Sequence, residues 1–129
     1  MTELRLKPER ITGIPHLLAA LGYSLGGIRR LWKEAAFRHI CLALLPCLGL
    51  LALVGASLVE FGGFLIVFFC LIAVESLNTA IECIVDHLAP GWEEFARDAK
   101  DLGSLATMCL LLANGVFVAA VLTRHLVIS

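Results

Sequence analysis

The sequence "FGGFLIVFFCLIAVESLNTAIECIVDH", residues 61–87, combines a long apolar run with four strongly polar side chains near its end. At 100° per helical residue, Glu75, Glu82 and Asp86 fall within an arc of about 40°, and Asn78 lies about 60° to one side. A charged side chain near the centre of a bilayer costs roughly 2.5–3.5 kcal/mol on insertion scales. The pattern therefore predicts an apolar helix that carries one polar, functional stripe.

The rest of the chain indicates a helical membrane protein. Of its 129 residues, 60% are hydrophobic, and its mean hydropathy is +0.92. Residues 40–59, 61–85 and 102–123 are each long enough to cross a hydrocarbon core of about 30 Å as a helix. The net charge of −1 gives no indication of a nucleic-acid partner.

The N-terminal residues and the cysteines argue against a secreted or disulfide-linked protein and against a zinc site. The N-terminal residues 1–18 lack a compact apolar segment with a cleavage site, so no signal peptide is predicted. The cysteines lie in apolar surroundings without metal-ligand spacing, which favours reduced thiols over disulfides or a zinc site. They are Cys41, Cys47, Cys70, Cys83 and Cys109.

Positive charges predict the orientation. They gather before the first span and in the connection 86–101, so both regions are expected in the cytoplasm and the C-terminus outside. Residues 14–38 have apolar residues with basic groups between them, which indicates one or two amphipathic helices on the inner membrane surface, with a break near Gly26 and Gly27. We therefore expect one domain, 1–129, with a cytoplasmic surface region, 1–38, and a tight turn around Glu60. The basic residues are Arg5, Lys7, Arg10, Arg29, Arg30, Lys33 and Arg38 before the first span, Arg97 and Lys100 in the connection, and Arg124.

Three interpretations of the polar stripe are possible. Its side chains could bond to neighbouring helices, carry protons or cations, or hold a divalent metal and supply a base. Measured from Asp86, Glu82 lies about 6 Å and Glu75 about 16 Å into the helix. Glu34 lies at the same membrane face, and Lys100 with Asp101 begins the third span. Carboxylates for a metal beside a lysine for phosphate favour a nucleotide-dependent reaction.

Four segments resemble the prokaryotic diacylglycerol kinase family. They are "GYSLGGIRRLW" (22–32), "EAAFR" (34–38), "VESLNTAIECIVDHL" (74–88) and "AKDLGS" (99–104). The resemblance implies an all-α homotrimer in the inner membrane, with three transmembrane helices and an amphipathic surface helix per subunit. Its members transfer the γ-phosphate of Mg·ATP to a lipid alcohol.

The resemblance also implies roles for individual residues. Glu75 matches the catalytic carboxylate, proposed as the general base, and Glu34 and Glu82 match metal ligands. ATP contacts are implied for Tyr23, Glu34, Glu82, Gly91, Trp92, Glu93, Lys100 and Asp101. Site-lining roles are implied for Asn78 and Asp86, and lipid contacts for Ala36, Phe37, Arg38, His39, Ile40, Glu75 and Ser104. The chain departs from the family pattern at His16, Ile40 and Asp98.

We therefore expect an ATP-dependent kinase that converts diacylglycerol to phosphatidic acid, with Mg²⁺ as cofactor. Undecaprenol, the substrate of some family members, is an alternative lipid. A proton-coupled transporter that uses Glu75 and Glu82 is the alternative from another class.

Overall fold

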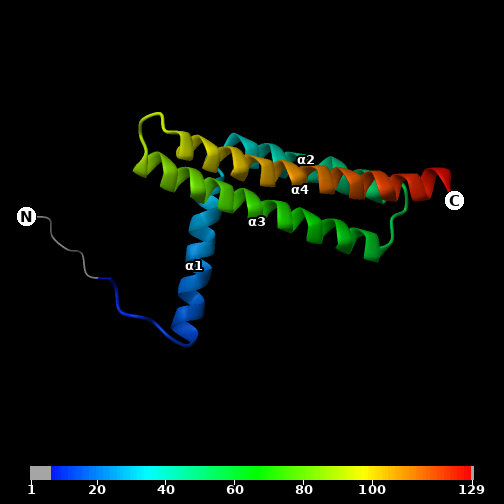
Figure 1. The fold of residues 1–129 in the computed structure, drawn as a ribbon. Helices are drawn as coiled ribbons and strands as arrows, with labels where there is room; N and C mark the ends of the chain where they lie inside the picture. The colour runs from blue at the N-terminus through cyan, green and yellow to red at the C-terminus, as the bar shows by residue number, and fades with distance from the viewer. Residues whose placement is uncertain (1–6, 129) are drawn as a thin grey trace, which may run out of the picture.

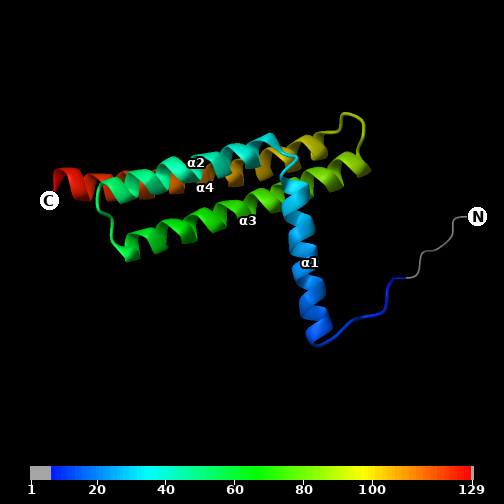
Figure 2. The ribbon, with the colours of Figure 1, turned by 180° about the vertical axis from the view of Figure 1, so that it is seen from behind.

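The computed structural model describes residues 7–128 as an all-α fold, and this part of the chain contains no strand. Its helices are α1 (Ile14–Leu31), α2 (Ala35–Leu53), α3 (Leu58–Leu88) and α4 (Glu94–Val127). The helices α2, α3 and α4 run alongside one another, and α1 leaves them at a steep angle (Figures 1 and 2). The predicted fold class, a bundle of three long helices with an additional N-terminal helix, is confirmed for one chain.

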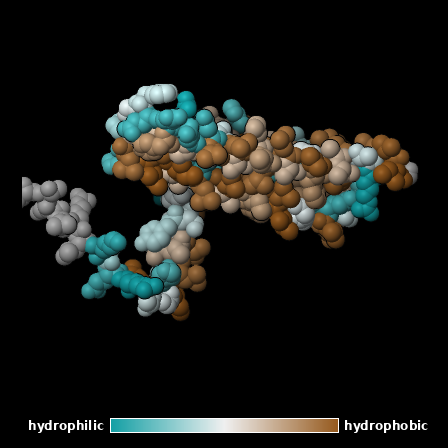
Figure 3. Space-filling view, viewed as in Figure 1, coloured by the Kyte–Doolittle hydropathy of each residue, from teal (hydrophilic) through white to brown (hydrophobic). Residues whose placement is uncertain are grey.

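The helices α2, α3 and α4 are each long and apolar enough to cross a membrane. The multi-pass prediction is therefore confirmed, although the helices are longer than the predicted spans at the α3–α4 end. The α3–α4 connection comprises only residues 89–93, whereas 86–101 was expected. Figure 3 shows apolar residues along the bundle and hydrophilic residues over this connection, with a smaller hydrophilic area at the opposite end.

The first membrane helix was predicted to end at residue 59, but α2 ends at Leu53, where the turn to α3 begins. Gly55 has a φ of 73°, a left-handed conformation that favours glycine, and α2 ends at Leu53. Ser57 then caps α3: its hydroxyl accepts from the Glu60 amide at 3.2 Å, and its amide donates to Glu60 Oε2 at 2.7 Å. Glu60 therefore lies in the first turn of α3 because this capping box starts the helix before it.

The helix α1 is continuous, so the break expected near Gly26 and Gly27 is wrong. Glycine lowers helix propensity by about 1 kcal/mol, which is too little to break a helix when nothing favours another backbone conformation. The helix ends at Leu31, earlier than the predicted 14–38. Glu34 is extended and occupies the N-cap position of α2, so a new helix begins after it. Residues 1–6, including Arg5, lie outside the described residues.

The apolar side chains of α1 remain exposed. Leu17, Leu18, Leu21 and Ile28 recur at helical spacing, and each is more than half exposed. Only Leu31, at the end that meets the bundle, is buried among the residues of this helix. A helix of this kind fits the plane of a membrane surface, with its apolar side chains in the lipid.

The main apolar core lies between α2, α3 and α4, in the half of the bundle away from the α3–α4 connection. It contains Ile40, Leu51, Phe64, Phe68, Leu71 and Val121. Towards the connection, α3 and α4 extend beyond the point where α1 joins the bundle (Figures 1 and 2). This end leaves room for polar cavities.

A charged cluster joins the opposite ends of α3 and α4. Glu60 is 8% exposed, and it accepts a bond from Arg124 Nη1 at 3.0 Å. The ring nitrogen Nε2 of His125 lies 3.0 Å from Glu60 Oε2. The sequence interpretation did not predict this cluster, which links the start of α3 to the end of α4.

Candidate active site

Three helices contribute to an acidic cavity of about 450 Å³ at the level where α1 meets the bundle. Its residues are Glu34, Ala36, Glu75, Asn78, Glu82, Ser104, Thr107, Met108 and Leu111. Glu34 comes from the start of α2, Glu75, Asn78 and Glu82 from α3, and the last four from α4. The structure thus brings Glu34 beside most of the polar stripe, although 41 or more residues of sequence separate them.

Glu75 is the most deeply buried carboxylate of the cavity, with 4% of its surface exposed. Thr107 Oγ1, from α4, donates to Glu75 Oε2 at 3.1 Å. A single hydroxyl donor orients the carboxylate and leaves acceptor capacity on its oxygens. Sequence reasoning missed Thr107, because one threonine in an apolar helix gives no signal by itself.

Asn78 lies between Glu82 and the backbone of α4. Its Nδ2 donates to Glu82 Oε1 at 3.4 Å, and its Oδ1 is buried with no hydrogen-bond partner among the described residues. This oxygen lies against Gly103, where a Cβ atom would also approach Asn78 Cγ to 3.2 Å. Gly103, a second residue that sequence reasoning missed, therefore permits the close approach of α4 to the polar stripe.

Arg30 joins the acidic cavity to α1. Its Nη1 donates to Glu34 Oε1 at 2.5 Å, and its Nη2 donates to Cys83 Sγ, on α3, at 3.3 Å. The bond to Glu34 raises the pKa of the Arg30 guanidinium, which therefore stays positively charged. Arg30 was predicted only as a cytoplasmic charge; its contacts place α1 against α3 beside Glu82.

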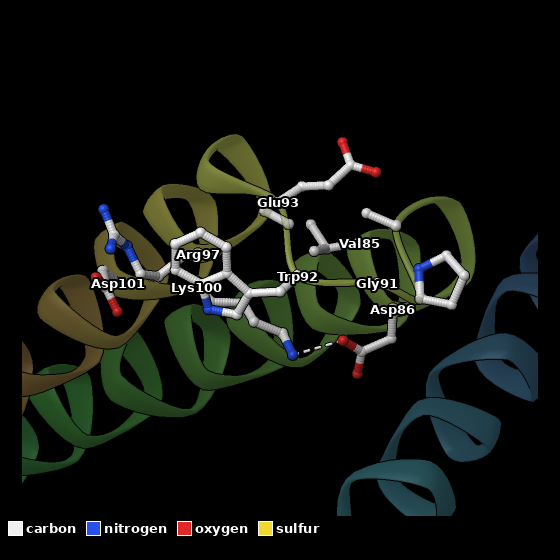
Figure 4. Close-up of a pocket in the computed structure, with 11 residues that line it drawn as sticks. Val85, Asp86, Gly91, Trp92, Glu93, Arg97, Lys100 and Asp101 are labelled. Carbon is white, nitrogen blue, oxygen red and sulfur yellow. Dashed lines mark ion pairs between the residues drawn. The ribbon is translucent and has the colours of Figure 1, made fainter.

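A second cavity of about 490 Å³ lies under the α3–α4 connection (Figure 4). Its lining includes six predicted site residues: Asp86, Gly91, Trp92, Glu93, Lys100 and Asp101. Lys100 Nζ lies 2.5 Å from Asp86 Oδ1, and Figure 4 shows the lysine extending towards that carboxylate. We call this space the loop cavity. It follows the acidic cavity along α3, because Asp86 lies one turn beyond Glu82.

Some of the predicted lipid contacts line a cavity, whereas others are buried or hold the turn before α2. Ala36, His39 and Ile40 line a third cavity of about 320 Å³, which also reaches Thr107. Phe37 is buried, with its ring centroid 6.1 Å from that of Trp32. Arg38 Nη1 donates to the backbone oxygens of Trp32 and Lys33, so it holds the turn before α2.

The predicted ATP contact Tyr23 lies apart from both larger cavities. It is 77% exposed near the middle of α1 and lines neither the acidic cavity nor the loop cavity. The structure therefore brings seven of the eight predicted ATP contacts to two neighbouring cavities and leaves Tyr23 outside them.

The donor groups of the acidic cavity fit Mg²⁺. Carboxylate oxygens are hard ligands, and Mg²⁺ commonly uses one or two of them together with substrate phosphates. Within the described residues, no three His, Cys, Asp or Glu side chains are grouped closely enough to hold an ion. Glu34 and Glu82 would therefore hold the ion jointly with a nucleotide, rather than as a complete protein site.

These features define a membrane-embedded helical protein with an acidic site at one end of the bundle. Comparison with known proteins identifies its family. The model of the family "Prokaryotic diacylglycerol kinase" matches residues 22–122. A diacylglycerol kinase of Sinorhizobium sp. is 48% identical over 113 residues, which cover 88% of this chain and 82% of that protein.

More distant relatives carry the same name. The diacylglycerol kinase of Haemophilus influenzae is 32% identical over 83% of this chain and 92% of its own length. That of Escherichia coli K12 is 30% identical over 88% of this chain and 94% of its own length. The chain belongs to the prokaryotic diacylglycerol kinase family, and the predictions of this family and of a kinase are confirmed.

Proposed function

We propose that the chain, acting as one kinase domain, transfers the γ-phosphate of Mg·ATP to diacylglycerol and releases phosphatidic acid and ADP. The observation that carries this proposal is the single cavity shared by Glu34, Glu75 and Glu82. Membership of the family and the names of its relatives support the choice of diacylglycerol. A transporter is disfavoured because its polar groups would continue through the membrane. Between the acidic cavity and the Glu60 cluster at the opposite end, the core of this bundle consists of apolar side chains.

Glu75 is the general base of the proposed reaction. Its carboxylate takes the proton of the lipid hydroxyl while the hydroxyl oxygen bonds to the γ-phosphorus. The bond from this phosphorus to the bridging β,γ oxygen breaks, and that electron pair leaves with ADP. Thr107 fixes the orientation of Glu75, and such alignment is a main contribution that a protein makes to phosphoryl transfer.

Glu34 and Glu82 are the proposed ligands of Mg²⁺, which when bound neutralises charge on the transferring phosphate. Asn78 supports Glu82 through its Nδ2 bond. Lys100, Asp101 and residues 91–93 of the loop cavity contact the rest of the nucleotide. The remaining predicted contact, Tyr23, requires either movement of α1 or a neighbouring subunit to reach the ATP.

The site would lie at the cytoplasmic face of the inner membrane. Basic residues precede α2 and occur beside the α3–α4 connection, so the positive-inside rule places both in the cytoplasm and the C-terminus in the periplasm. With α1 on the membrane surface, Glu75 lies just inside the lipid, and the loop cavity lies in water. Ala36, His39, Ile40 and Ser104, which line the cavities at this level, then face the lipid substrate, whose hydroxyl stays at headgroup level. Phe37 and Arg38, also predicted as lipid contacts, instead hold the turn that positions these residues.

A homotrimer would enclose this site. At most 28% of the candidate membrane window of any of the three long helices is buried within one chain. The acidic cavity contains three carboxylates, and exposing charged groups to hydrocarbon is costly. A neighbouring subunit that covers the cavity removes this cost.

The proposed function is tested by transfer of labelled γ-phosphate from ATP to lipid by the detergent-solubilised chain with Mg²⁺. Diacylglycerol and undecaprenol are compared side by side at equal mole fraction in the micelles. We expect faster labelling of diacylglycerol. Faster labelling of undecaprenol would change the proposed substrate, and ATP consumption that neither lipid stimulates would refute the proposal.

A further inference from the structure

Arg97 is a second cation of the loop cavity, beside the predicted phosphate contact Lys100. The two residues are three positions apart at the start of α4, so their side chains lie on neighbouring parts of one helix face. In Figure 4 the Trp92 ring lies between the two side chains: Lys100 extends towards Asp86, and the Arg97 guanidinium lies on the other side of the ring. From the sequence, Arg97 was predicted only as a cytoplasmic charge.

Trp92 holds the guanidinium of Arg97 by a cation–π contact. The Arg97 Cζ atom lies 5.5 Å from the centre of the Trp92 ring. A cation–π contact uses the charge of the guanidinium and not its N–H groups, so these donors remain available to an anion. Trp92 therefore limits the freedom of a long side chain without using its hydrogen bonds.

The existing ion pairs leave Arg97 less compensated than Lys100. Lys100 lies 2.5 Å from Asp86, a residue of the same cavity. Arg97 Nη2 lies 3.5 Å from Asp98 Oδ1, at the limit of a hydrogen bond, and both side chains are more than half exposed. Asp98 does not line the cavity. An entering anion can therefore bind the Arg97 donors without displacing a strong partner.

We propose that Arg97, held by Trp92, binds the phosphate groups of the nucleotide in the loop cavity. This inference rests on the proposed function, because it takes the loop cavity as part of the nucleotide site. The planar guanidinium suits two phosphate oxygens at once. It acts in binding the nucleotide and takes no part in the proton transfer at Glu75.

The test measures Mg·ATP binding to the full-length, detergent-solubilised chain by equilibrium dialysis without lipid. Loss of a charge-assisted contact predicts that R97A raises the Kd for Mg·ATP about tenfold. R97K restores part of the affinity, and W92L weakens binding more than W92F, which retains an aromatic ring. The matched control R10A removes an arginine from the segment before α1 and leaves the Kd unchanged.

Two further readouts distinguish a phosphate contact from a general structural role. Added salt weakens binding to the parent chain more than to R97A, because one charge contact is already missing. In steady-state turnover, R97A raises the KM for ATP and leaves the KM for diacylglycerol unchanged. An R97A chain that keeps its thermal stability and binds Mg·ATP as tightly as the parent would overturn this inference. Absence of transfer to diacylglycerol by a parent chain that binds ATP would instead refute the proposed function.

Discussion

Replacing Gly103 by alanine tests how closely α4 must approach the polar stripe. The added Cβ would overlap Asn78 Oδ1 and would lie 3.2 Å from Asn78 Cγ and 3.8 Å from Asn78 Cα. Either the Asn78 side chain rotates and loses its bond to Glu82, or α3 and α4 move apart. Both responses disturb the acidic cavity, so G103A is expected to lower kinase turnover.

Gly115 supplies a matched control in the same helix, because a Cβ added there meets no atom within 4 Å. Each substitution gains about 1 kcal/mol of helix propensity, and this gain cancels when the two variants are compared. Overpacking in a close-packed interface costs about 1–3 kcal/mol. G103A should therefore be less stable than G115A by about 1–3 kcal/mol.

The measurement is the free energy of unfolding of each variant in mixed micelles titrated with a denaturing detergent, together with its kcat for lipid phosphorylation. We expect G115A to match or exceed the stability of the parent and to retain its turnover. Equal stability and equal turnover of G103A and G115A would show that the tight contact between Asn78 and Gly103 is absent.

Two further substitutions test the active site and the opposite end of the bundle independently. T107V removes the hydroxyl that donates to Glu75, and it should lower kcat about tenfold with little change in the KM for ATP; unchanged kcat would show that this bond does not orient the base. E60Q removes the charge that faces Arg124 and His125, so it should lower the unfolding temperature and leave the KM values unchanged. Unaltered thermal unfolding of E60Q would show that the cluster does not hold α3 to α4.

The spans and the polar stripe could be predicted because each depends on local sequence. Three apolar segments of sufficient length identify the helices, and a period of 3.6 residues places Glu75 and Glu82 on one face of α3. The helix ends were less predictable. The start of α3 depends on a capping box between Ser57 and Glu60, and α1 is continuous because two glycines do not suffice to break it.

The partners of the stripe could not be predicted, because they depend on which helix faces α3 and in which register. Gly103, Thr107 and Asn114 all lie on the face of α4 that meets α3. Small or polar residues at spacings of four and seven in an apolar helix are the signal that could have indicated this face. The contact between Arg30 and Cys83 joins residues 53 positions apart, and no local pattern predicts it.

The most direct measurement of the proposed chemistry compares E75Q with the parent chain in transfer of labelled γ-phosphate to diacylglycerol, alongside Mg·ATP binding. Loss of a general base predicts a fall in kcat of at least about a hundredfold. The Kd for Mg·ATP should stay unchanged, because Glu34, Glu82 and Lys100 remain in place. An E75Q chain that phosphorylates diacylglycerol at the parent rate would contradict the assignment of Glu75 as the catalytic base.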